Sequence, residues 1–177
     1  DAFIAGEIGY GTILHDGGYT CIVVNEKLNF VNANVNVTRT GTSYTSASFL
    51  NCAELNVTNS TLNMKGCVYA GDKYFVAAAT SVVIDSATVS IENSGYGRGF
   101  KTGSMTVKNS SNVSLTSTQG YTSMIEADTL ALENSTMTLN AAASDGGVAA
   151  MVVANDFAVP NATLSARAGN APAVKVG

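Results

Sequence analysis

Short stretches in which apolar and polar residues alternate recur along most of the chain. Each recurrence has an alternating stretch, a bend of small polar residues (Asn-Ser-Thr in its clearest form), and a second alternating stretch. Alternation with a period of two predicts a strand with one buried face. Each copy therefore predicts two short strands joined by a tight bend. The six copies span residues 28–35, 55–62, 82–89, 105–113, 130–137 and 157–164.

The spacing of these copies predicts how they pack. Their last residues lie 27, 27, 24, 24 and 27 positions apart, and a third apolar stretch precedes the next copy. A unit of this size cannot bury its apolar row alone, so the copies must stack on one another. We predict an all-β chain that forms one parallel β-solenoid of about six to seven coils, with 24–27 residues per coil. Residues 1–21 are expected to form an entry segment or partial cap, and residues 22–177 the repeats.

The bends align in a single column. Asparagine tolerates the left-handed backbone conformation, and its amide can hydrogen-bond to copies above and below it. We therefore predict a structural ladder at one corner of the solenoid. Its members are Asn32, Asn59, Ser86, Asn109, Asn134 and Asn161.

Several asparagines also lie in Asn-x-Ser/Thr sequons, which are acceptors for N-glycosylation in secreted proteins. Those in the bend column have a structural explanation, because the corner itself favours Asn, a small residue, then Ser or Thr. Outside the column, Asn36, Asn56 and Asn112 remain candidates for glycosylation.

The coil length and the Asn-Ser-Thr corner resemble those of right-handed parallel β-helix proteins, the pectin-lyase-like superfamily. The resemblance covers about Ile22 to Val176. That superfamily includes polysaccharide lyases and hydrolases, phage tailspikes, and the stalks of bacterial adhesins and autotransporter passengers. The sequence is closest in character to these stalks. The resemblance implies a right-handed coil and a secreted or cell-surface location. Fold alone does not assign a function.

Charged residues at matching positions of successive copies alternate in sign, which favours surface ion pairs over a catalytic cluster. The superfamily's enzymes use clustered carboxylates, and these columns offer no such group. Glu126 and Asp128 could join Asp156 in a weak calcium site, or be solvated carboxylates. His15 is the only histidine and has no triad partners in the pattern. We expect no catalysis, cofactor or metal. The alternating columns contain Asp85, Lys108 and Glu133, then Lys65 and Glu92, and then Lys101 and Glu126.

Four tyrosines recur in the segment that follows the second strand, spaced 25, 27 and 25 residues apart. An exposed row of this kind suits a sugar ring or a partner's surface, whereas an internal row would only pack the loops. Both explanations remain open. Arg98 lies in the same segments and is the best single polar candidate for ligand binding. The row consists of Tyr44, Tyr69, Tyr96 and Tyr121.

Composition narrows the classes of function. Only 12% of residues are charged and the net charge is −4, which argues against a nucleic-acid binder. No apolar stretch has the length of a membrane-spanning helix. Cys21, Cys52 and Cys67 leave both one disulfide and free thiols open.

These observations predict an extracellular structural or adhesive β-solenoid without catalysis: a surface stalk, a filament subunit or a binding module. The alternative is a polysaccharide lyase-like, hydrolase-like or carbohydrate-binding β-helix. Residues 173–176 look like the start of an uncapped further coil, so either continuation in a longer chain or end-to-end self-association is expected. Expected partners are a glycan or a host or cell-surface protein.

Overall fold

The computed structural model describes residues 20, 22–40, 48–68, 73–96, 98–118, 123–141, 149–169 and 171–177, and the backbone of 2–15. Over these residues the chain is a parallel β-solenoid, as predicted, and no helix long and apolar enough to cross a membrane occurs among them. The strands are β1 (Ala2–His15), β2 (Ile22–Val23), β3 (Lys27–Arg39), β4 (Leu50–Thr58), β5 (Thr61–Gly66), β6 (Tyr74–Asp85), β7 (Thr88–Asn93), β8 (Arg98–Lys108), β9 (Asn112–Ser117), β10 (Ile125–Leu132), β11 (Thr136–Ala141), β12 (Met151–Ala158), β13 (Thr163–Arg167) and β14 (Val174–Val176).

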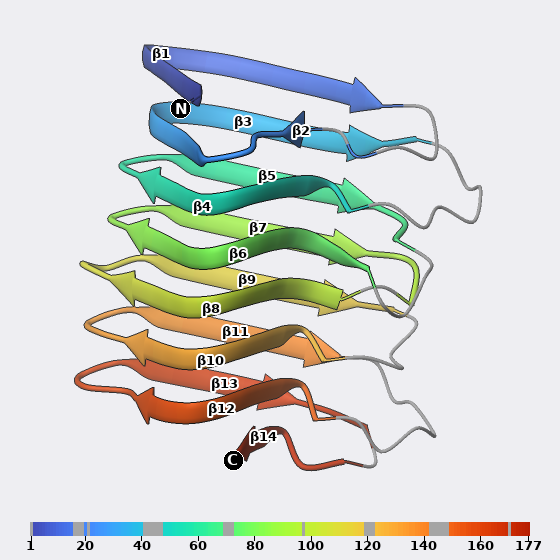
Figure 1. The fold of residues 1–177 in the computed structure, drawn as a ribbon, viewed down its shortest axis with the longest axis vertical. Coiled ribbons are helices and arrows are strands. Elements are labelled where there is room, and N and C mark those ends of the chain that lie inside the picture. The colour runs from blue at the N-terminus through green and yellow to red at the C-terminus, as the bar shows by residue number, and fades with distance from the viewer. Residues whose placement is uncertain are drawn as a thin grey trace.

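The strands form two columns that run the length of the molecule (Figure 1). One column stacks β3, β5, β7, β9, β11 and β13, and the other stacks β4, β6, β8, β10, β12 and β14. This is about five full turns from β3 to β13, roughly the predicted number. At the N-terminal end, β1 pairs in parallel with β3, so the predicted entry segment contributes a further strand to the stack.

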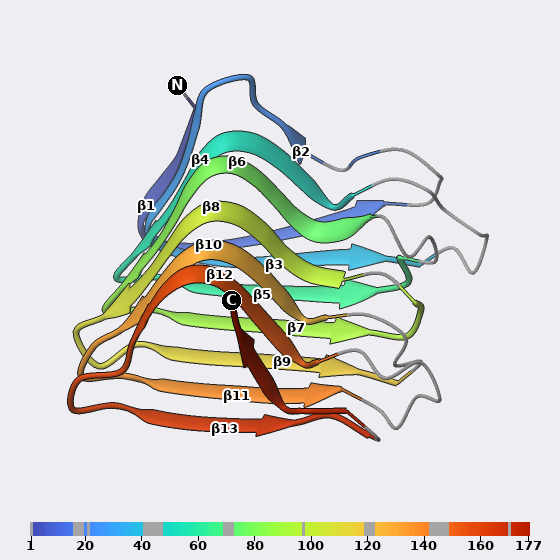
Figure 2. The same cartoon turned by 60° about the horizontal axis from the view of Figure 1, so that its bottom comes forward.

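The coils are three-sided because the second column bends within its strands. Figure 2 shows β3 to β13 as a flat layer and β4 to β12 as an arch above it. The arch coincides with shifts in register, for example between Ala78 and Ser81 of β6. Each coil thus has two faces from one bent strand and a third, flat face from the next strand.

The core consists of columns of inward side chains that the register aligns from coil to coil. On the flat layer Leu62, Val89, Val113 and Met137 form one such column, and each is fully buried. Apolar burial of this kind contributes about 25 cal/mol per Å². Because every coil adds an equivalent row, the interior is continuous along the axis.

The predicted corner is confirmed in its backbone conformation. All six members of the bend column have positive φ angles, between 47° and 58°. The backbone N–H groups of Asn59 and Asn134 donate to the carbonyls of Asp85 and Pro160 on the next coil, at 3.0 and 3.1 Å. The amide-to-amide bonds that the structure shows lie in neighbouring columns instead, from Asn56 to Asn29 and from Asn63 to Asn36.

The residue after the bend explains why serine recurs there. The hydroxyl of Ser60 points inward and accepts the backbone N–H of Ala33 at 3.0 Å, and Ser111 does the same for Ala87. A buried N–H without a partner would be costly. Serine at this position therefore satisfies the backbone of the preceding coil.

The corner conformation gives a direct test at Asn134. Replacement by alanine should lower the free energy of unfolding by about 1 kcal/mol, because a left-handed backbone disfavours a Cβ without a compensating side chain. Replacement by glycine should be nearly neutral, since glycine adopts positive φ freely. Urea unfolding of both variants measures this, with Asn140→Ala on extended backbone as the control. Equal losses for Asn134→Ala and Asn134→Gly would contradict the backbone explanation.

Candidate functional site

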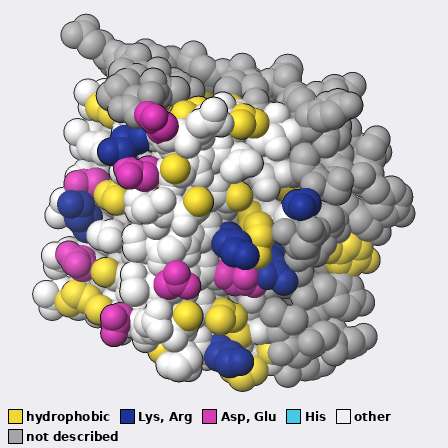
Figure 3. Space-filling view, viewed as in Figure 1, with side chains coloured by type: hydrophobic (Ala, Val, Ile, Leu, Met, Phe, Trp, Pro, Cys, Tyr) yellow, Lys and Arg dark blue, Asp and Glu magenta, His cyan; other side chains and the backbone are white. Residues whose placement is uncertain are grey.

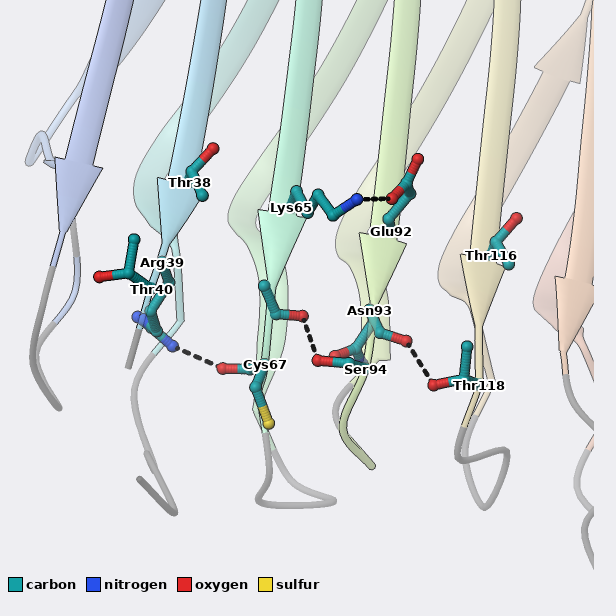
Figure 4. A pocket seen from close by; sticks show the side chains of 11 residues that line it. Thr38, Arg39, Thr40, Lys65, Cys67, Glu92, Asn93, Ser94, Thr116 and Thr118 are labelled. Atoms are coloured by element: carbon teal, nitrogen blue, oxygen red, sulfur yellow. Dashed lines mark hydrogen bonds and ion pairs between the residues drawn. The ribbon is translucent and has the colours of Figure 1, made fainter. Parts of the chain in front are cut away.

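A groove runs along the edge where the strands of the flat layer end. Its volume is about 520 Å³, and it crosses four consecutive coils, from β3 through β5 and β7 to β9 (Figure 4). We call it the strand-end groove. It is lined by Thr38, Arg39, Thr40, Lys65, Gly66, Cys67, Glu92, Asn93, Ser94, Thr116 and Thr118.

The first part of its floor is held by a buried arginine. Arg39 is only 3% exposed, and its guanidinium lies 4.3 Å from the centroid of the Phe49 ring. It donates to the carbonyls of Cys67, at 3.1 Å, and Ser48, at 3.3 Å. A buried cation needs such partners, and it fixes the backbone segments that carry them.

Gly66 is what allows the arginine to lie there. Its φ angle is +149°, and a Cβ at this position would lie 2.9 Å from both the Arg39 Cβ and a ring carbon of Phe49. A larger residue would therefore force the Arg39 backbone or the Phe49 ring to shift.

The next part of the floor is held by a buried amide. Asn93 is 2% exposed, and its side-chain oxygen accepts the backbone N–H groups of Val68 and Gly95. Its own carbonyl accepts the N–H of Thr118 at 3.0 Å. The side chain thus links two consecutive coils, and the backbone carbonyl of the same residue adds the third.

Outward side chains of the last strand positions form the wall. Thr38, Lys65, Glu92 and Thr116 follow one another in register, one from each coil. The Lys65 ammonium lies 2.7 Å from the Glu92 carboxylate, and both side chains are well exposed, at 70% and 62%. The wall therefore presents hydroxyls on either side of a compensated ion pair, as Figure 4 shows.

A second polar cluster lies on the bent column. The buried Tyr74 hydroxyl donates to the Glu126 carboxylate, and the Arg98 guanidinium donates to the Tyr74 oxygen and pairs with Glu126. The Lys101 ammonium lies 5.5 Å from the centroid of the Tyr74 ring. Burial first, and then the Glu126 charge, raise the pKa of Tyr74, while Arg98 opposes the rise. The cluster joins three coils and keeps the phenol neutral.

The predicted tyrosine row is described at one member only. Tyr96 is half-buried, while Tyr44, Tyr69 and Tyr121 lie outside the described residues. Arg98, predicted as a ligand-binding residue, is committed to Tyr74 and Glu126. Its geometry favours a structural role.

The charge columns pair as expected in two places, at Lys65–Glu92 and at Lys108–Asp85, the latter at 3.4 Å. Lys101 is in register with Glu126, but the carboxylate pairs with Arg98 instead. Among the described residues no three His, Cys, Asp or Glu side chains gather as metal ligands. The alternative calcium site at Glu126, Asp128 and Asp156 is therefore wrong.

The glycosylation candidates occupy different surroundings. Asn36 and Asn56 each share a side-chain hydrogen bond with an asparagine of a neighbouring coil, whereas Asn112 is exposed at the start of β9. Asn112 is thus the most accessible of the three sequons.

Burial raises the pKa of the Cys52 thiol to about 11, and Cys21 lies outside the described residues.

Sequence reasoning missed the two side chains that build the groove floor. Arg39 continues the inward positions Val35 and Val37, and Asn93 continues Val89 and Ile91. A polar residue at an inward position of a strand is the signal that could have found them, because such residues are buried only with partners.

Comparison with known proteins leaves the assignment at the level of fold. No protein-family model, no curated protein and no solved structure matches this chain. The class defined by the structure is that of the parallel β-solenoid repeat proteins.

The half-buried cluster should matter more for stability than the exposed ion pair. Glu126→Ala leaves the Tyr74 hydroxyl and the Arg98 guanidinium without their carboxylate, so we expect a loss of about 1–3 kcal/mol. Glu92→Ala removes an exposed pair, and the loss should stay below about 1 kcal/mol. Denaturant unfolding compares the two, and equal losses would contradict a structural role for the cluster.

Asp85 should carry part of the stability at neutral pH. The Asn109 amide foremost holds the pKa of this carboxyl below its usual value; burial, the second-largest cause, opposes this, and the Ser86 hydroxyl and Lys108 add to the lowering. A lowered folded pKa means that the carboxylate stabilises the fold above about pH 4, the value of the unfolded chain, and that this contribution disappears as pH falls through the folded pKa.

The measurement is the free energy of unfolding of wild type and Asp85→Asn across pH. The difference between them should be constant above about pH 5 and should shrink below about pH 4. Asp128→Asn, which removes an exposed carboxylate on β10, is the control. A difference between wild type and Asp85→Asn that does not change with pH would refute the assignment.

Proposed function

We propose that this protein is an extracellular structural or adhesive β-solenoid, a rigid module that displays a binding surface and catalyses no reaction. The resemblance to adhesin and passenger stalks of the pectin-lyase-like superfamily supports this class, as does the solenoid architecture. Its partner is a glycan or a protein at a cell surface.

The observation that carries the proposal is that outward polar groups pair with one another from coil to coil. Ion pairs run between consecutive coils, from Lys27 to Glu54 at 2.9 Å as well as at the two charge columns. Side-chain amides do the same between Asn56 and Asn29. These groups connect each coil to the next, which stiffens the stack.

The surface supports the same conclusion. On the face shown in Figure 3, Lys and Arg side chains are interspersed with Asp and Glu side chains, and several of opposite sign lie next to one another amid neutral groups. The pattern gives no strong field of either sign to steer a charged substrate. A neutral polar surface of this type suits a module that acts by contact in the extracellular medium.

The alternative is a carbohydrate-processing or carbohydrate-binding β-helix. Processing would need carboxylates placed for acid–base or calcium-assisted chemistry, whereas Glu126 and Asp85 are held by cations and hydrogen bonds. Binding without processing is favoured by the strand-end groove, a concave site on an otherwise rigid body.

Two assays on the purified full chain test the proposal. Incubation with pectin, alginate and chondroitin should release neither unsaturated products nor new reducing ends. The labelled chain should be retained on immobilised extracellular matrix or on intact cells, and the retention should saturate. The chain inactivated by heat is the control. Product release, or the absence of retention on every surface, would overturn the proposal.

A further inference from the structure

We propose that the strand-end groove binds a neutral oligosaccharide segment laid across the coils. This inference rests on the proposed adhesive function, of which it names the site and the class of ligand.

The size and direction of the groove suit a short, extended ligand. Its volume of about 520 Å³ lies in the range of small-molecule sites, roughly 300–1,000 Å³. Strands are about 4.8 Å apart, so the three steps from β3 to β9 extend about 14 Å. The groove crosses one strand end at each step, and threonines lie at both of its ends, which matches an extended chain rather than a single compact molecule.

The lining suits the two-sided character of a sugar ring. Thr38, Thr40 and Thr116 each present a hydroxyl and a methyl group, Thr118 presents its methyl group while its hydroxyl donates to the Asn93 carbonyl at 3.5 Å, and the Lys65 side chain adds an aliphatic stem. A pyranose carries hydroxyls around its edge and C–H groups on its faces. Threonines can meet both kinds of group without a change of rotamer, whereas a purely apolar ligand would leave their hydroxyls without partners.

The charges favour a ligand without charge. Lys65 and Glu92 neutralise each other at 2.7 Å in the middle of the wall. The Arg39 guanidinium below them is bound to two backbone carbonyls. An acidic sugar would have to draw Lys65 from Glu92 and would itself be repelled by the carboxylate, so uronate-containing and sialylated chains are disfavoured.

The groove is fixed before any ligand arrives. Arg39 and Asn93 are almost completely buried, and between them they bind backbone groups of Ser48, Cys67, Val68 and Gly95. Ordering a site on binding lowers affinity, so a floor held by buried hydrogen bonds avoids part of this loss. Buried polar groups at the floor and exposed hydroxyls at the wall are the arrangement expected of a binding site on rigid elements.

The test uses the full chain against immobilised oligosaccharides of three kinds: neutral hexose and N-acetylhexosamine chains, uronate-containing chains and sialylated chains, with short neutral peptides as a fourth probe. Binding is measured by surface plasmon resonance at low and high salt. We expect binding to at least one neutral chain, with an affinity that changes less than about twofold with salt, because no net charge pairs with the ligand.

The groove is tested by filling it. Thr116→Trp should weaken binding at least tenfold, because an indole at this position occupies the space between β7 and β9. Asn140→Trp is the matched control: it lies in the same outward row, one coil beyond the groove, and should bind as the wild type does. Thr38→Trp, at the opposite end, provides a second filling variant, and circular dichroism checks that each variant is folded.

The outcomes separate this inference from the proposed function. If the chain is retained on cells or matrix but binds no neutral oligosaccharide, or if both filling variants bind as the wild type does, the groove assignment is overturned and the adhesive function stands. Binding only to acidic chains or only to peptides also overturns it. If the chain is retained on no surface and yet binds a neutral oligosaccharide in the groove, the adhesive function fails and the site stands.

Discussion

Parallel, in-register stacking of coils is the constraint on which the rest of the structure depends. Each inward residue rests on its equivalents one coil above and below, so an apolar column such as Leu62, Val89 and Val113 must stay apolar throughout. Each backbone N–H at a corner must find its carbonyl one coil away, which explains the left-handed bend column and the inward serine beside it. Repeat proteins derive their stability from such nearest-neighbour interfaces.

The same constraint explains where distinctive groups occur. In the middle of a strand an unusual side chain would disturb its two neighbours in the column, but a strand end borders on the turns, where the packing requirement relaxes. Arg39 and Asn93 occupy such ends, and each uses its polar atoms to hold the turns of adjacent coils. The strand-end groove therefore lies where strands end in polar residues, on the part of the coil that can vary without loss of the stack.

What the sequence could predict follows from the same distinction. The coil length and the corner at Asn59 and Asn134 were predictable because each recurs in six copies. The ion pair between Lys65 and Glu92 was predictable because the repeat aligns these two residues on consecutive coils. The cluster around Tyr74 was not, because its members occur in single copies, although Tyr74 and Arg98 are in register. Glu126 aligns with Lys101 in the ladder, yet it binds Arg98, three residues earlier in β8. Residues such as Arg39 have no equivalent in the other copies, so no repeated pattern in the sequence indicates their role.

The direction of the hydrogen bonds has a mechanical consequence. The ladders of β3 to β13 run along the axis, and the two ends of the chain lie at opposite ends of the stack (Figure 1). A pull along the axis would load the terminal coil alone, and its bonds would open in sequence while the inner coils stayed intact. Each released coil of about 25 residues would extend to roughly 80 Å in place of a rise of about 4.8 Å. Under load such a rod lengthens in steps, dissipating work coil by coil before it fails.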